Sequence, residues 1–153
     1  MTIILAFLIG VFAGLRSLTA PAAVAWAAYF GWLKLDGPLG LFGHTASVAI
    51  LSVLAVAELV ADKLPKTPAR TAPLGLGARI VTGAMSGAAV AVAGNQAAIL
   101  GAVLGAAGGV VGAFAGYQVR TRLVKALRIR DLVVALLEDA VAIAGSLLVV
   151  SHA

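Results

Sequence analysis

The chain has 153 residues, of which 62% are hydrophobic and 11% are charged, against roughly 25% charged residues in ordinary soluble domains. A soluble domain of this length could not bury so much apolar surface, so we predict one all-α domain, residues 1–153, in a lipid bilayer. The net charge of +5 does not indicate nucleic acid, because the cations lie between apolar runs without an aromatic–basic surface. The absence of cysteine excludes disulfides and thiolate chemistry.

The first predicted helix covers residues 3–33 and is broken at residues 16–21, near an arginine and a proline. Because Arg16 interrupts the apolar run and no cation precedes it, we expect a retained helix rather than a cleaved signal peptide. Ser17 or Thr19 is a candidate cap for the second piece. Two arrangements remain open: a long, broken helix that crosses the membrane, or a re-entrant hairpin that enters from outside with Arg16 at its tip.

Four more helices are predicted from the apolar runs and the turn residues between them. They cover about residues 45–64, 79–93, 97–117 with a basic amphipathic extension to 130, and 131–150. Asp131 is a candidate cap for the last of them. With the broken first helix, the fold class is an integral membrane protein of about five hydrophobic helices.

Glycines recur every four residues on the third and fourth of these helices. The ridges are Gly83 and Gly87; Gly101, Gly105 and Gly109; and Gly108, Gly112 and Gly116. This spacing lets helix backbones approach closely in lipid, within a subunit or between subunits. We therefore expect glycine-ridge packing and a homo-oligomer formed through the glycine-rich helices. A phosphate-binding glycine loop is excluded, since no strand or polar context precedes the glycines.

The distribution of cations predicts the orientation. Nine of the eleven Lys and Arg residues lie in residues 63–79 and 118–130. By the positive-inside rule both basic loops are cytoplasmic, which places the carboxyl terminus outside. The side of the amino terminus stays open, because it depends on the arrangement of residues 3–33.

Acidic residues are rare, and most of them lie where acids are costly. Of the six in the chain, Glu58, Glu138 and Asp139 lie inside apolar segments and Asp62 lies at the margin of one. Such groups indicate a functional site by default. Counting helical rise places Glu58 about 9 Å and Glu138 about 10 Å from the cytoplasmic side. Four adjacent carboxylates require a proton, a metal ion or an arginine, and Arg16 at a hairpin tip would reach the same depth.

Two sequence motifs carry a resemblance to a known family. They are GLRSLTAPAA at residues 14–23 and ELVADKLPKTPART at residues 58–71, supported by ARIV at residues 78–81. They resemble a family of small bacterial membrane proteins that carry a domain of unknown function, and the similarity covers nearly the whole chain. The resemblance implies an integral protein of the bacterial cytoplasmic (inner) membrane. It implies no activity, cofactor or catalytic residue.

Three functions are compatible with these features. The first is a proton- or cation-linked transporter or channel, in which Arg16 is a gate or anion contact. Its predicted ion- or proton-binding residues are Glu58, Asp62, Glu138 and Asp139. The second is a membrane enzyme or carrier that binds lipid phosphate and whose acids hold a divalent metal. Its predicted phosphate contacts are Lys63, Lys66, Arg70, Arg120 and Arg122.

The third function is structural or assembly-related, with the charges serving only topology. In that case the acids near helix ends extend to the membrane interface and Glu138 pairs with Arg120 or Arg122. An enzyme is the less favoured class, because no histidine stands near the acids and no acyl- or phosphoryl-transfer motif occurs. We predict no cofactor, no nucleic-acid partner, and the lipid bilayer as the surrounding medium.

Overall fold

The computed structural model describes residues 1–63, 71–127 and 130–153, and its regular structure in these residues is entirely helical. In chain order the elements are α1 (Thr2–Leu15), α2 (Thr19–Tyr29), the 3-10 helix η1 (Gly37–Gly43), α3 (Thr45–Ala61), α4 (Pro73–Ala93), α5 (Ala98–Leu127) and α6 (Asp131–Ser151). Helices α4, α5 and α6 are long and apolar enough to cross a membrane, and η1 with α3, bent by 65°, would form a fourth span. The predicted all-α membrane fold is confirmed.

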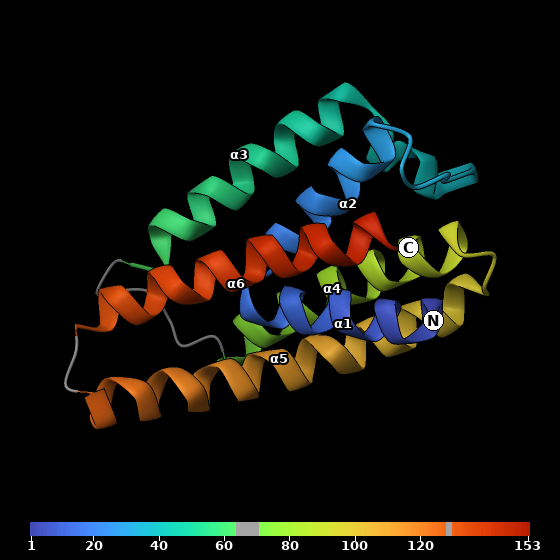
Figure 1. The fold of residues 1–153 in the computed structure, drawn as a ribbon. Helices are drawn as coiled ribbons and strands as arrows, with labels where there is room; N and C mark the ends of the chain where they lie inside the picture. Colours follow the sequence, from blue (N-terminus) through green and yellow to red (C-terminus); the bar gives the residue numbers. More distant parts are fainter. Residues whose placement is uncertain (64–70, 128–129) are drawn as a thin grey trace.

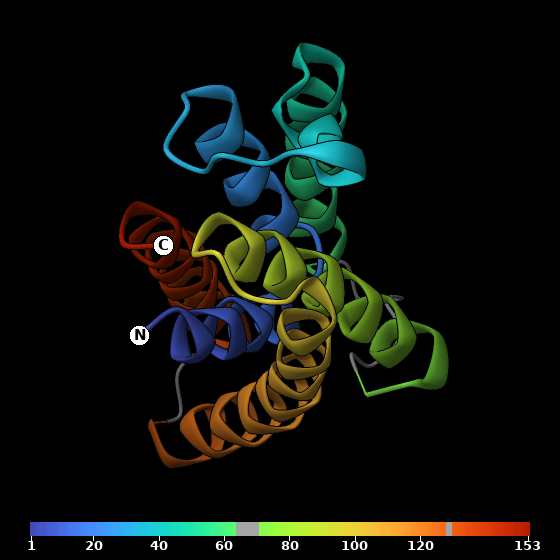
Figure 2. The same cartoon turned by 90° about the vertical axis from the view of Figure 1, so that its right-hand side faces the viewer.

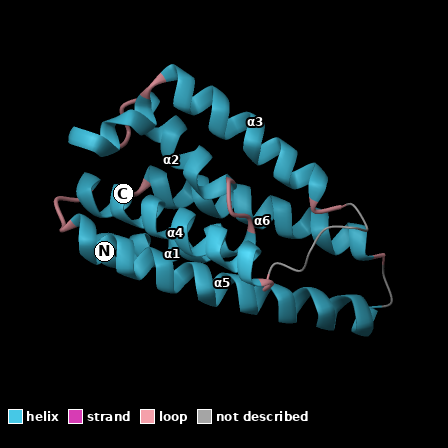
Figure 3. Ribbon diagram, turned by 180° about the vertical axis from the view of Figure 1, so that it is seen from behind, coloured by secondary structure: helices cyan, strands magenta, loops and turns pink. Residues whose placement is uncertain are grey.

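Helices α1 and α2 form a V-shaped hairpin. In Figure 1, α1 runs inward from the end that holds both chain termini, and α2 returns toward that same end. The carboxyl ends of α3 and α5 lie at the opposite end, as the view from behind in Figure 3 also shows. Of the two predicted arrangements of the broken first helix, the hairpin is therefore the one observed.

The hairpin turns because its backbone leaves the helix at Arg16, which is extended with φ −140° and ψ 111°. Helix α2 resumes at Thr19, and its third residue is Pro21. A proline is tolerated there because the first N–H groups of a helix have no intrahelical acceptor. The predicted break at residues 16–21 thus reduces to the three residues 16–18.

Helix α4 begins six residues earlier than predicted. Residues 73–78 had been assigned to a basic, proline-rich loop, but Pro73 is the first residue of α4 and Ala72 precedes it in an extended conformation. Proline favours the first helical position, since its fixed φ suits a helix and its missing N–H is not needed there. The extra turns place Arg79 inside the helix rather than at its start, so Arg79 is a buried residue of the bundle and not a loop cation.

Glycines bring α1, α4 and α5 into backbone contact. A Cβ atom at Gly105 would lie 2.9 Å from the Gly83 carbonyl carbon and 3.0 Å from the Gly87 Cα atom. On the other side of α5, a Cβ atom at Gly108 would lie 2.8 Å from the Val11 backbone nitrogen. Helix α5 therefore packs on α4 along one ridge and on α1 along the other. These ridges are used within the chain, so the predicted homo-oligomer, which stays a prediction, would need other faces.

Helix α3 lies at the edge of the bundle. It packs against α2 and η1, and the end-on view in Figure 2 places it on the opposite side of the bundle from α5. Only Val48 and Ala55 on this helix are buried. Polar contacts at its carboxyl end therefore contribute much of its attachment to the other helices.

Candidate functional site

The tip of the α1–α2 hairpin carries a fully buried arginine. Arg16 Nε donates to Asp139 Oδ1 of α6 at 2.6 Å. Its Nη1 donates to Asp62 Oδ2 at the end of α3. Its Nη2 lies 4.0 Å from Glu138 Oε2. One guanidinium thus joins the hairpin to α3 and α6, with the fork geometry that suits two carboxylates at once.

Glu58 binds the same tip from α3. Its Oε1 accepts hydrogen bonds from the Ser17 N–H at 2.8 Å and from the Ser17 hydroxyl at 2.6 Å. Its Oε2 accepts from the Leu18 N–H at 2.8 Å. The sequence predicted Ser17 or Thr19 as the cap of α2, but neither side chain caps this helix. A carboxylate from another helix takes that place, where the helix dipole favours negative charge.

Arg79 completes the surroundings of Glu58 and was not among the predicted site residues. It is buried, and its Nη2 lies 3.9 Å from Glu58 Oε1. Its Nε donates to the Gly14 carbonyl at 3.0 Å, near the carboxyl end of α1, where a cation is favourable. The sequence analysis missed Arg79 as a site residue because it counted Arg79 among the loop cations. Pro73, which favours the first position of a helix, was the signal that α4 begins earlier.

Two further cations neutralise the acids of α6. Lys63 Nζ lies 2.5 Å from Asp139 Oδ2 and 2.7 Å from the Leu59 carbonyl oxygen. Arg120 Nη1 lies 3.8 Å from Glu138 Oε2, so this pair, predicted under the structural interpretation, is present.

Asp131 does not cap α6. It is the first residue of that helix, and no side-chain cap is formed. Its carboxylate binds Arg120 instead, at 2.8 Å from Nε and 2.5 Å from Nη2. The Arg120 fork therefore connects the end of α5 to the start of α6.

Together these groups form what we call the charge cluster. Its members are Glu58, Asp62, Glu138 and Asp139 with Arg16, Lys63, Arg79 and Arg120. Four carboxylates meet four cations, one of which, Arg120, also binds Asp131, so the four acids predicted to bind ions or protons are brought together among cations. Of the three companions expected for such acids, arginine is present in the cluster. Among the described residues, no group of acids and histidines is arranged to hold a metal ion.

Three predicted phosphate contacts remain to be placed: Lys66, Arg70 and Arg122. Arg122 is exposed on α5, and Lys66 and Arg70 lie outside the described residues. Lys63 and Arg120, the other two predicted contacts, are engaged with carboxylates of the chain itself.

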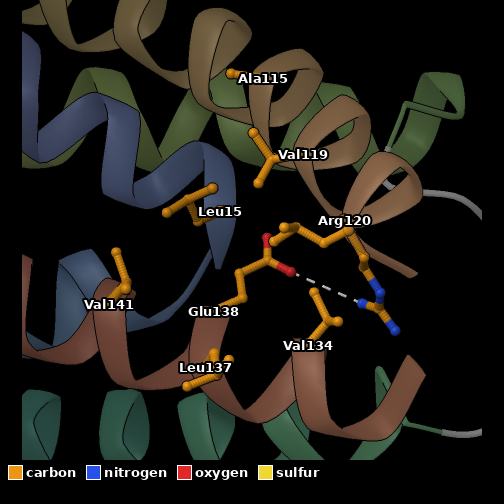
Figure 4. A pocket seen from close by; sticks show the side chains of 10 residues that line it. Leu15, Ala115, Val119, Arg120, Val134, Leu137, Glu138 and Val141 are labelled. Atoms are coloured by element: carbon orange, nitrogen blue, oxygen red, sulfur yellow. Dashed lines mark ion pairs between the residues drawn. The ribbon is translucent and has the colours of Figure 1, made fainter. Parts of the chain in front are cut away.

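An apolar groove of about 280 Å³ reaches the charge cluster between α5 and α6. Its walls include Leu15, Val119 and Val141, and Figure 4 shows Glu138 and Arg120 among them, joined by their ion pair. The groove therefore gives a path from the side of the bundle to Glu138.

Residues 3–153 match the family described as a domain of unknown function, DUF4126. The chain belongs to the DUF4126 family. This confirms the resemblance seen in the two motifs, and both motifs supply the charge cluster of this DUF4126 chain: Arg16 comes from the first, and Glu58 and Asp62 come from the second. No curated protein and no solved structure matches the chain.

Proposed function

We propose that this chain is a small proton- or cation-linked transporter or channel whose working part is the charge cluster at the hairpin tip. The observation that carries the proposal is that Glu58 holds the free amino end of α2, within a bundle of apolar helices. Discontinuous helices whose ends bind charged groups are the parts from which secondary transporters build their ion sites. Eight charged groups among membrane-spanning helices are energetically costly, so helices with a purely structural role rarely contain them.

The contacts of α3 suggest how ion binding would be linked to movement. Glu58 accepts three hydrogen bonds from the hairpin, and Asp62 accepts one from Arg16. A proton or cation on these carboxylates would weaken their hold on the tip. Because the apolar contacts of α3 are with α2 and η1, its carboxyl end would then be held to α6 mainly by the Lys63–Asp139 pair and could move away from the bundle more easily. Binding would thereby open the site.

Flux measurements on two carboxylate variants test the proposal. In proteoliposomes under an imposed pH or Na⁺ gradient, we expect Glu58→Gln and Glu138→Gln to reduce proton or Na⁺ flux by about tenfold or more. The reason is that glutamine keeps the size of the side chain but lacks its negative charge and cannot take up a proton. Dyes sensitive to pH and to Na⁺ in the vesicle lumen measure the rates.

Asp36→Asn is the matched control, because Asp36 is an exposed acid in the turn between α2 and η1. Its flux should equal that of the unmodified chain. Flux that survives in the Glu58→Gln, Glu138→Gln double variant would contradict the assignment and favour the structural or assembly role.

The hairpin also predicts the sides of both termini. The termini lie together at the end opposite the carboxyl ends of α3 and α5, which lead into the two basic loops. If those loops are cytoplasmic, both termini lie outside. Alkaline phosphatase fused to either terminus should therefore be active, and a fluorescent protein exported unfolded should be dark there. A cytoplasmic amino terminus would contradict this orientation.

The lipid-phosphate alternative has less support. Lys63 and Arg120, two of its predicted contacts, are already bound to Asp139 and Asp131. A phosphate would have to displace these carboxylates. The groove between α5 and α6 has apolar walls that suit an acyl chain, but such grooves are ordinary features of lipid-facing helices.

A further inference from the structure

Three buried hydroxyl groups have no hydrogen-bond partner in the part of the chain that the structure describes. They belong to Thr19, Ser86 and Ser146. Ser86 and Ser146 are 0% exposed, and Thr19 is 6% exposed. A buried hydroxyl without a partner is costly and rare in native proteins, so each of these calls for an explanation.

Two other hydroxyls of the helical bundle, one on α4 and one on α5, behave differently. The Thr82 hydroxyl donates to the Ala78 carbonyl of its own helix at 2.9 Å, and the Thr121 hydroxyl donates to the Tyr117 carbonyl at 2.8 Å. This back-bonding is the usual way for a hydroxyl to be satisfied inside a membrane helix. Thr82 and Thr121 are more exposed than the three unpartnered residues. The hydroxyls that lack the bond are therefore those that point into the bundle.

The register of α4 and α6 places two of these hydroxyls above the charge cluster. Ser86 follows Arg79 by seven residues, and Ser146 follows Asp139 by seven residues, so each shares a helix face with its charged residue. Seven residues correspond to about 10 Å of helix. Both helices run from the charge cluster toward the end that holds the termini. The two serines thus lie at similar heights, closer to that end.

Helix α2 lies against both of these helices. It packs on α4 and on α6, and Thr19 is its first residue, next to the tip that binds Glu58. The inner surface of α2 is made of small side chains such as Ala20 and Ala23. Thr19 therefore lies at the charge-cluster end of α2, and Ser86 and Ser146 lie on the two helices that α2 contacts, nearer the end of the termini.

We propose that Thr19, Ser86 and Ser146 line a water-accessible half-channel between α2, α4 and α6, which connects the charge cluster with the face that holds the termini. This inference rests on the proposed function and adds the route by which a proton or small cation reaches the acids. A hydroxyl both donates and accepts hydrogen bonds, so it suits a chain of water molecules.

Cysteine accessibility tests the half-channel directly. The chain has no cysteine, so Ser86→Cys and Ser146→Cys each introduce a single thiol of nearly the same size as the serine. In oriented membranes, a cationic methanethiosulfonate reagent is added on the side of the termini. Only a thiol that water reaches forms the reactive thiolate.

Ala91→Cys is the matched control. Ala91 is buried on α4, the same helix as Ser86, but it faces Gly101 of α5 rather than α2. We expect both serine positions to react at least about tenfold faster than position 91. Equal, slow rates at all three positions would overturn the half-channel.

A flux measurement separates this inference from the proposed function. The Ser86→Ala, Ser146→Ala double variant should lose flux while its thermal stability is kept or raised, because it loses two unsatisfied hydroxyls. Flux without labelling at the serines contradicts the half-channel alone. Labelling without flux in the unmodified chain contradicts transport and leaves the half-channel standing.

Discussion

Replacing Arg16 with glutamine should destabilise the folded chain by about 3–5 kcal/mol, the range found when one partner of a buried ion pair is removed. Arg16 is fully buried and donates to Asp139 and Asp62. Without it these carboxylates face one another with only Lys63 to neutralise them. Thermal unfolding in detergent, followed by loss of the monodisperse peak in size-exclusion chromatography, measures the effect.

Two further variants make this test specific. Arg122→Gln removes an exposed arginine from α5 and should leave the unfolding temperature unchanged. The Arg16→Gln, Asp62→Asn, Asp139→Asn triple variant should recover much of the lost stability, since neutral groups that hydrogen-bond can replace a buried ion pair. If Arg16→Gln unfolds at the same temperature as Arg122→Gln, then Arg16 does not join the hairpin to α3 and α6.

The second large effect is expected at Gly105, where alanine should destabilise the chain by about 1–3 kcal/mol through overpacking. The added methyl group would meet the backbone of Gly83 and Gly87, which cannot rotate aside as a side chain can. Helix α4 would have to move away from α5, and the contact between α1 and α4 at Gly10 would be disturbed as well. The same unfolding measurement applies.

Gly77→Ala is the matched control for this substitution, since Gly77 lies in α4 with nothing within 4 Å of an added Cβ atom. At such a position alanine should stabilise the helix by up to about 1 kcal/mol. The two substitutions are chemically identical, but they should change the free energy of unfolding in opposite directions. Destabilisation of equal size at both positions would show that helix flexibility, rather than close packing, explains the glycines.

Local patterns were sufficient to predict most of the helices. The last helix was predicted at residues 131–150 and observed at Asp131–Ser151, and the second predicted helix was expected to begin at residue 45, as α3 does. Apolar runs and their breaks report on lipid exposure, which is a local property of each segment. The start of α4 was missed because cations and prolines were interpreted as a loop, although proline is also favoured at the start of a helix.

The charge cluster was predicted in part. Intramembrane cost alone selected Arg16 and the four acids, and helical rise placed Glu58, Glu138 and the hairpin tip at about one depth. Depth does not determine partners, however. Glu58 and Glu138 were placed at matching depths, whereas Glu58 binds Ser17 and Leu18, and Arg16 binds the two aspartates. Partners depend on the rotation and tilt of each helix, which arise from packing with the others.

By itself, the sequence determined the membrane setting, the break after α1 and the residue types of the charge cluster, because composition and periodicity act within a single segment. Only the tertiary structure decided that the break is a hairpin, that Arg79 faces Glu58, and that the glycine ridges serve α1 and α4 of the same chain. These features depend on contacts between segments far apart in the chain. In lipid such contacts are selected by close packing and by pairing of buried polar groups, neither of which a local pattern records.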